Sequence, residues 1–190
     1  MGQKAITIYT PEGTAAHIAA EDDAFIHRCA LGGDSGLLGA LACARVDDNT
    51  VRLSGGGVSN HGYILWIPEG ENAELAIESG TAGYNRVDTV VSVFTKGGGE
   101  VADTHTFAVV KGTGVTGEPS PPSLASSALL SSGQVSQTAL FYVRLTGSAI
   151  TSVTRAGRIL PAGSSLPAIS FGTAAPSGGS DGDIYFRIES

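Results

Sequence analysis

The chain has little charge and few aromatic side chains. Asp, Glu, Lys and Arg together make up 15% of its 190 residues, against about 25% in an average soluble domain. Aromatic residues contribute only 6%, whereas glycine is abundant at 27 residues. Small residues and a weakly charged surface are typical of a strand-rich protein with many turns, or of one whose surface is partly buried against identical copies.

Clusters of basic residues are also missing. The net charge is −7, and Lys and Arg are scattered along the chain. Binding to a phosphate backbone depends on positive charge that displaces counterions, so we expect no nucleic-acid partner. The acidic residues are scattered as well, so no acidic tail is expected.

Long apolar runs are absent too. None approaches the roughly 20 residues of a membrane-spanning helix, so we expect no membrane insertion. The first residues alternate in the manner of a strand and lack a signal-peptide core. Myristoylation at Gly2 is disfavoured because Ile6 stands where Ser or Thr is preferred. The expected place of synthesis is a cytoplasm.

Cysteine and histidine are too sparse for a metal centre. The two cysteines, Cys29 and Cys43, are expected to be reduced, buried thiols rather than a disulfide, and their spacing does not suit zinc. No two of the four histidines have the spacing of metal ligands; they are His17, His27, His61 and His105. We therefore expect neither a metal nor a cofactor.

A short helix is predicted within residues 14–29. Its early acidic residues favour the positive end of a helix dipole; they are Glu21, Asp22 and Asp23. Three further residues share one apolar face, namely Phe25, Ile26 and Cys29. Two glycines at positions 32 and 33 end the helix.

The rest of the chain has the pattern of strands. They are predicted at residues 38–46, 50–54, 62–67, 73–78, 87–95, 105–111, 138–145, 150–153 and 183–188. Glycines 55–57 are expected to break one run, and residues 68–72 to end another. Strands recurring about every 8 to 12 residues, with turn residues between them, predict a mainly β fold: an antiparallel β-sandwich or jelly roll.

The most regular stretch is a pair of β-branched runs, residues 83–94 and 107–114, with the second followed by a proline-rich exit. They predict an antiparallel strand pair. Arg86 and Asp88 are two residues apart and therefore share one face of their strand. We expect them to form a structural ion pair that fixes the register of the strand.

The proline-rich exit is the best candidate for a domain boundary. Prolines favour extended backbone and cannot donate to a sheet; they are Pro119, Pro121 and Pro122. The sequence predicts a sandwich domain at 1–113, a linker or strap at 114–137 and a small β-rich region at 138–190. Few large apolar residues lie in that last region, so we expect it to depend on another domain or subunit for burial.

Two motifs suggest catalysis or nucleotide binding, and both fail on context. His17 and Ser35 resemble the histidine and serine of chymotrypsin-like proteases, but they are too close in sequence to lie in two β-barrels with an aspartate between them. Residues 112–117 match G-x-G-x-x-G, yet prolines follow where a dinucleotide site needs a helix. We expect no enzymatic activity.

Two further groups of residues have both a structural and a binding interpretation. Residues 47–49 and 181–183 carry oxygens suited to calcium, but each lacks a complete loop, which favours turn chemistry. Tyr63, Trp66 and Tyr84 are candidates for a sugar-binding platform. Because Tyr63 and Trp66 are three apart, they face opposite sides of a strand, which favours ordinary packing.

Three segments resemble structural proteins of the tail, baseplate and fibre of tailed bacteriophages and Gram-positive prophages. They are residues 20–24, residues 80–91 with 109–113, and residues 171–186. The shared motifs are a G-x-x-x-R-x-D-x-V-V strand, a strand ending in V-x-K-G-T before a proline-rich exit, and a P-x-G-G-x-D-G-D-I-Y segment. The exit departs from the usual alanine-proline linker, because Gly and Ser are inserted in residues 114–122.

The resemblance implies a non-enzymatic virion component, commonly a homotrimer, that is made in the host cytoplasm and contacts other tail or baseplate proteins. A role in host attachment would follow. The alternative is a carbohydrate-binding module for a host surface glycan, based on Tyr63, Trp66 and the Gly-rich loops. A serine hydrolase rests only on His17 and Ser35.

Overall fold

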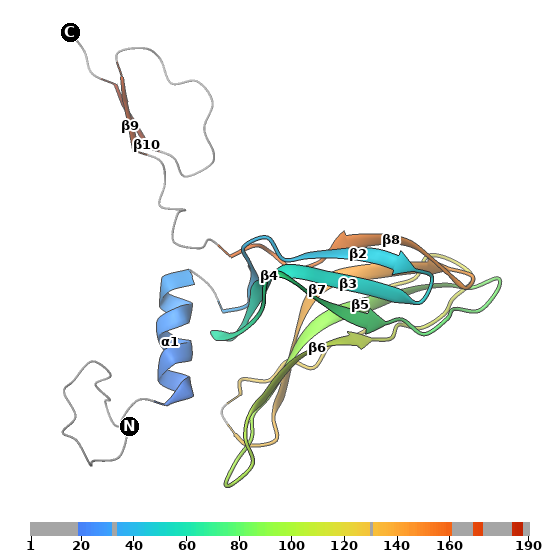
Figure 1. The fold of residues 1–190 in the computed structure, drawn as a ribbon, viewed down its shortest axis with the longest axis horizontal. Coiled ribbons are helices and arrows are strands. Elements are labelled where there is room, and N and C mark those ends of the chain that lie inside the picture. Colours follow the sequence, from blue (N-terminus) through green and yellow to red (C-terminus); the bar gives the residue numbers. More distant parts are fainter. Residues whose placement is uncertain (1–18, 32–33, 130, 161–168, 173–183, 188–190) are drawn as a thin grey trace.

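The computed structural model describes residues 19–31, 34–129, 131–160, 169–172 and 184–187. The fold is mainly β with one short helix, as predicted (Figure 1). Its elements are α1 (Ala20–Leu31), β1 (Gly36–Leu38), β2 (Ala42–Asp47), β3 (Thr50–Asn60), β4 (Tyr63–Ala76), β5 (Asn85–Thr95), β6 (Thr104–Val110), β7 (Val135–Thr146), β8 (Ala149–Arg155), β9 (Ile169–Gly172) and β10 (Ile184–Arg187).

Two antiparallel sheets pack against each other. In the first sheet, β3 pairs with β1 and β2 along one edge and with β4 along the other. The second sheet has the order β6-β5-β7-β8. From β1 to β8 the chain passes between the sheets once, after β4, so the fold is a sandwich of two sheets formed one after the other rather than a jelly roll. In the second sheet β7 does not pair with the preceding strand β6 but with the other side of β5. Strands β9 and β10 form a separate parallel pair.

The core lies between the two sheets. Alternation along β3 turns Val51 and Leu53 inward, and both are fully buried. The fully buried residues of the second sheet include Val90 on β5 and Val143 and Leu145 on β7. Each such side chain contributes about 1.5–3 kcal/mol relative to an exposed one.

Strands β7 and β8 belong to the same sandwich as the N-terminal half of the chain. The sequence prediction assigned residues 138–190 to a separate region, but β7 pairs with β5 along its length, from Asn85↔Thr146 to Thr95↔Val135. The prediction treated the prolines as a boundary, whereas they lie in a connection between two strands of one sheet. The described residues up to Leu160 therefore form one folded unit.

That connection, residues 111–129, runs back along β5 and β7 as a strap. Val115 exchanges two backbone hydrogen bonds with Asn85, at 2.7 and 2.9 Å. Further along, the backbone N–H of Gln137 donates to the carbonyl of Ala125 at 2.7 Å. Pro119 is buried. Of the two predicted forms of this segment, linker or strap, the structure has the strap.

Two predicted strand breaks are wrong. Strand β3 continues through glycines 55–57, and β4 continues through Pro68 and Gly70. The register between β3 and β4 shifts between Ser54 and Gly56, so that a bulge absorbs both irregular stretches. Proline is tolerated there because β4 is an edge strand.

Helix α1 packs beside β4 (Figure 1). It docks through Ala24, whose carbonyl lies so close to Gly62 that a Cβ there would stand 2.0 Å away. His27 Nδ1 and the carbonyl of Gly62 add a hydrogen bond at 2.9 Å. The acidic first turn is present as predicted.

The apolar face predicted for this helix is on its outside. Phe25 is 52% exposed and Ile26 is 43% exposed. Cys29 is also exposed, which corrects the prediction of two buried thiols, while Cys43 is half-buried and both are free. The residues that dock are small because the helix approaches the backbone of the β3–β4 turn.

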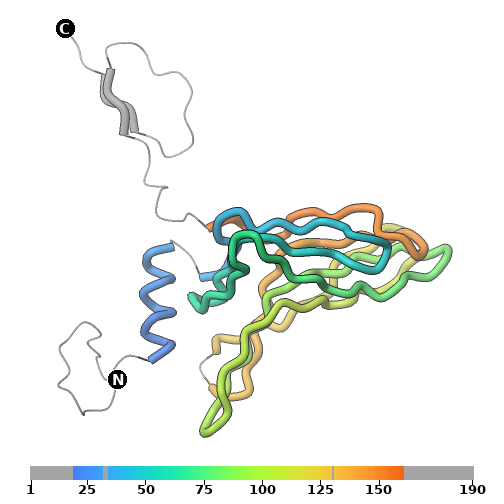
Figure 2. Tube along the Cα trace, viewed as in Figure 1, coloured from blue at the N-terminus to red at the C-terminus, as the bar shows by residue number. Residues whose placement is uncertain are grey.

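Strands β5 and β6 extend beyond the sandwich as an arm (Figure 2, green). Its tip is closed by paired backbone hydrogen bonds between Gly98 and Val101, each 3.0 Å. Val101 is 71% exposed. The predicted strand near the C-terminus is confirmed as β10, whereas residues 181–183, for which turn chemistry is predicted, lie outside the described residues.

Candidate functional site

The predicted ion pair between Arg86 and Asp88 is present and buried. Nε and Nη2 of Arg86 donate to the two carboxylate oxygens of Asp88 at 2.8 and 2.9 Å. Arg86 is 6% exposed and Asp88 is 1% exposed. A bidentate guanidinium–carboxylate pair has a fixed geometry, so it holds these two side chains on the inner face of β5.

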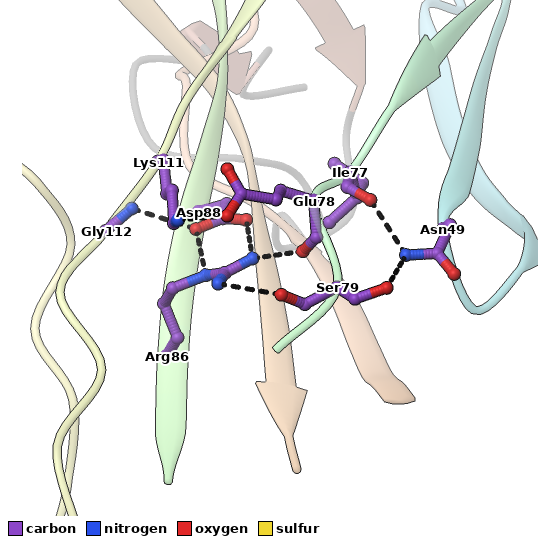
Figure 3. A network of polar contacts seen from close by, with 8 residues as sticks. All are labelled: Asn49, Ile77, Glu78, Ser79, Arg86, Asp88, Lys111 and Gly112. Carbon is purple, nitrogen blue, oxygen red and sulfur yellow. Dashed lines mark hydrogen bonds and ion pairs between the residues drawn. The ribbon is translucent and has the colours of Figure 1, made fainter. Parts of the chain in front are cut away.

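The pair also connects segments that are distant in sequence (Figure 3). Arg86 donates to the carbonyls of Glu78 and Ser79, in the segment that crosses from the first sheet to the second. The backbone N–H of Gly112 donates to Asp88 at 2.8 Å, where β6 ends. Arg86 and Asp88 thus clamp the crossover and the exit of β6 to β5.

A second contact holds the same crossover from the first sheet. Asn49, in the turn between β2 and β3, donates through Nδ2 to the carbonyl of Ile77 at 3.0 Å and to Ser79 Oγ at 2.7 Å (Figure 3). The polar network is therefore a structural joint between the sheets.

A cavity of about 370 Å³ opens beside this joint, and Tyr84 and Lys111 line it with Arg86. Both cations are already paired, because Lys111 binds Glu78 and this hydrogen bond lowers the pKa of the Glu78 carboxyl. The cavity therefore offers no uncompensated charge to an anionic ligand. Tyr84 is 45% exposed at its mouth.

Tyr63 lies at the opposite end of the sandwich. Its ring stacks on Phe94 with centroids 4.0 Å apart. Lys96 lies 6.0 Å from the Tyr63 ring and pairs with Glu21 of α1. Tyr63 is therefore a packing residue at the root of the arm rather than part of an open platform.

A neutral polar cluster near Tyr63 was not predicted from the sequence. Ser92 Oγ lies 2.6 Å from Nε2 of His105, and Asn60 Nδ2 donates to the carbonyls of Ser92 at 3.3 Å and Ser136 at 3.0 Å. Ser92 is fully buried, so a substrate has no access to this serine–histidine contact. Burial lowers the pKa of His105 to about 4, against a hydrogen bond to the backbone of Ile64.

Trp66 lies apart from both tyrosines, on the outer face of the first sheet. It is 65% exposed, and Tyr63 is on the other face of β4, as their spacing predicts. Trp66 lines a second cavity, of about 480 Å³, with Gly55 and Glu69. The three aromatic residues therefore do not form one surface.

The motifs rejected from the sequence have structural roles where they are described. Ser35 Oγ accepts a hydrogen bond from the N–H of His61 at 3.0 Å, while His17 lies outside the described residues. Residues 112–117 lead into the strap and no helix follows them. Asp47 accepts from the N–H of Asn49 at 2.8 Å, which is the predicted turn chemistry.

Neither a metal cluster nor a membrane-spanning helix occurs in the described part of the chain. Its His, Cys, Asp and Glu side chains form no group of three or more that suits a metal ion. Its one helix is too short and polar to cross a bilayer.

Cys43 is not an activated thiol. Burial raises the pKa of the Cys43 thiol to about 11, which makes it a poor nucleophile.

Comparison with known proteins finds no family model that matches the chain and no curated protein with significant similarity to it.

Proposed function

We propose that this chain is a non-enzymatic structural protein of the tail, baseplate or fibre of a tailed-phage virion or prophage particle, and that it assembles with copies of itself. The sequence motifs supply the class of protein. In the structure, the proposal is supported by polar groups whose hydrogen bonds hold strands and crossovers together, as at Arg86 and Asp88.

The main observation in support of self-assembly is the apolar face of α1 that points outward. Phe25 and Ile26 are both more than 40% exposed on the side of the helix away from Ala24. Cys29, which follows Phe25 by four residues and Ile26 by three, is exposed as well. An isolated helix of 12 residues is marginal in water, and exposed apolar groups at this helical spacing are typical of helix-to-helix contacts. A second copy of the same helix is the partner that we propose, in a trimer.

Light scattering coupled to size exclusion tests the assembly. We expect the wild-type protein to have the mass of three chains and Phe25→Glu to shift it toward the monomer, because the carboxylate would be desolvated at the contact. Ala20→Glu is the matched control, since Ala20 is exposed and lies one turn before Ala24, away from the face of Phe25 and Ile26. A wild-type monomer at high concentration would contradict the proposal.

A second measurement tests whether the protein is a component of the virion. Particles induced from the cell that encodes the chain can be purified on a density gradient and analysed by mass spectrometry. We expect the chain at a fixed stoichiometry to the other tail proteins. Its absence from intact particles would refute a virion role even if the purified protein is a trimer.

A further inference from the structure

The surroundings of Trp66 have features that the packing of the sandwich does not require. It is the single tryptophan of the chain, and it stands 65% exposed while the next residue, Ile67, is buried in the core. A large aromatic side chain left in water on a flat sheet gains little for folding. Such residues are enriched where a protein binds a partner.

The floor beside Trp66 is formed by glycines of β3. Gly57 is directly opposite Trp66 in the register. Gly56 is required by the fold, because its φ is 135° and a Cβ would lie 2.3 Å from the backbone N of Leu41. Gly55 is not required in this way, since the nearest atom to a Cβ would be 3.9 Å away. Its missing side chain keeps the cavity of about 480 Å³ open.

The rim of this groove carries hydrogen-bonding groups without partners. Ser54 and Glu69 line the groove, and Asn72 faces Ser54 across the β3–β4 register. All three are exposed, and among the described residues none of the three side chains has a hydrogen bond or ion pair. No Lys or Arg lines the groove, so its chemistry is that of a flat apolar wall with neutral and acidic acceptors.

We infer that the Trp66 groove binds a saccharide, with one face of a pyranose ring against the indole and its hydroxyls toward Ser54, Glu69 and Asn72. A pyranose ring has an apolar C–H face and a polar edge, which matches an aromatic wall beside acceptor oxygens. The absence of a cation disfavours phosphate or sulfate esters. The ligand class is therefore an uncharged or amino sugar.

A second copy of the chain is a poorer occupant. A stable contact between proteins buries about 800 Å² on each partner, and covering the rim with an apolar surface would leave the Ser54, Glu69 and Asn72 side chains without water or partners. The inference is independent of self-assembly, since α1 and Trp66 are on different elements.

The fluorescence of Trp66 reports directly on this groove because no other tryptophan contributes. We would titrate the full chain with methyl glycosides of glucose, galactose, mannose, rhamnose and N-acetylglucosamine, and with maltohexaose and chitohexaose. We expect a saturable change in emission with at least one of these probes. The same probe should protect Trp66 from quenching by acrylamide.

A substitution in the floor of the groove distinguishes specific binding of a sugar in the groove from nonspecific contact with the Trp66 ring. Gly55→Val should reduce the affinity at least tenfold by filling the groove, with Trp66 still present as the reporter. Gly117→Val is the matched control, because a Cβ there meets no atom within 4 Å and the residue lies in the strap. Circular dichroism of both variants checks that the sandwich is folded.

Three results would overturn the inference: emission unchanged by every probe, equal affinity in a folded Gly55→Val protein, or emission that changes with protein concentration instead of sugar. The last result would assign the groove to a contact between copies. Failure of sugar binding leaves the mass of the assembly unchanged, so it is distinguishable from failure of the proposed structural role.

Discussion

The two ends of β5 bury polar groups in different ways. The inward-facing residues of this strand are Arg86 and Asp88 at one end and Ser92 and Phe94 at the other, with Val90 fully buried between them. The first end holds a charged pair. The second holds a neutral cluster in which Ser92 contacts Asn60 and His105.

The difference follows from what each end must connect. Arg86 and Asp88 join β5 to backbone groups of the crossover and of Gly112, which belong to no ladder at those points. A guanidinium and a carboxylate offer many directional hydrogen bonds for this purpose. Asn60 and Ser92 connect strands whose backbone groups are already paired within their own sheets. Single neutral hydrogen bonds are therefore sufficient to connect them. We therefore expect the charged end to be the more sensitive to mutation.

Removing the carboxylate should give the largest effect. Asp88→Ala leaves the Arg86 guanidinium buried without its counter-charge, which is expected to cost about 3–5 kcal/mol of the free energy of unfolding. Urea denaturation measures this as a lower midpoint. The double variant Arg86→Met, Asp88→Leu should recover only part of the loss, since no charge remains buried but the backbone groups of Glu78, Ser79 and Gly112 lose their partners. A loss below about 1 kcal/mol in Asp88→Ala would show that the clamp does not hold the crossover.

Asn60→Ala should have a smaller effect at the neutral end. It removes the donor to the Ser92 and Ser136 carbonyls, and the expected cost is about 1–3 kcal/mol. Asn72→Ala is the control, because the exposed side chain of this asparagine makes no hydrogen bond to the described residues, and the change in the free energy of unfolding should stay within about 0.5 kcal/mol. If Asn60→Ala costs as much as Asp88→Ala, the two ends are equivalent.

The smallest effect is the pH dependence of the neutral end. The pKa of His105 is about 4 in the fold, below its ordinary value of 6.5, because burial disfavours the charged ring. The contribution of the neutral His105 ring to the free energy of unfolding is therefore fully present above pH 6.5, and it is lost as the pH falls toward 4. We expect a loss on the order of 1–2 kcal/mol, because solvent screens this partly buried group.

NMR titration of the His105 ring measures the pKa directly, and denaturation between pH 7 and 4.5 measures its effect on stability. In His105→Gln the part of the pH dependence between pH 6.5 and 4.5 should diminish, while the carboxylates still contribute at lower pH. A His105 ring that titrates near 6.5 would remove the basis for this difference between the two ends.

Local spacing was the reliable part of the sequence. The two-residue interval predicts that Arg86 and Asp88 share a face, and the three-residue interval predicts that Tyr63 and Trp66 do not; both hold in the structure. Strand breaks were less reliable, because the effect of residues 55–57 and Pro68 depends on whether the neighbouring strand can absorb a bulge. The Ser92–His105 contact joins two strands through a register that no local pattern specifies.

The sequence by itself determined the class of fold, the inward faces of the strands and the Arg86–Asp88 pair, because period-two alternation and spacing are properties of a single strand. Only the tertiary structure decided which side of α1 is buried, that β7 completes the sheet of β5, and that Trp66 stands over an open glycine floor. These features depend on which backbones approach closely, and that is set by contacts between residues far apart in the chain.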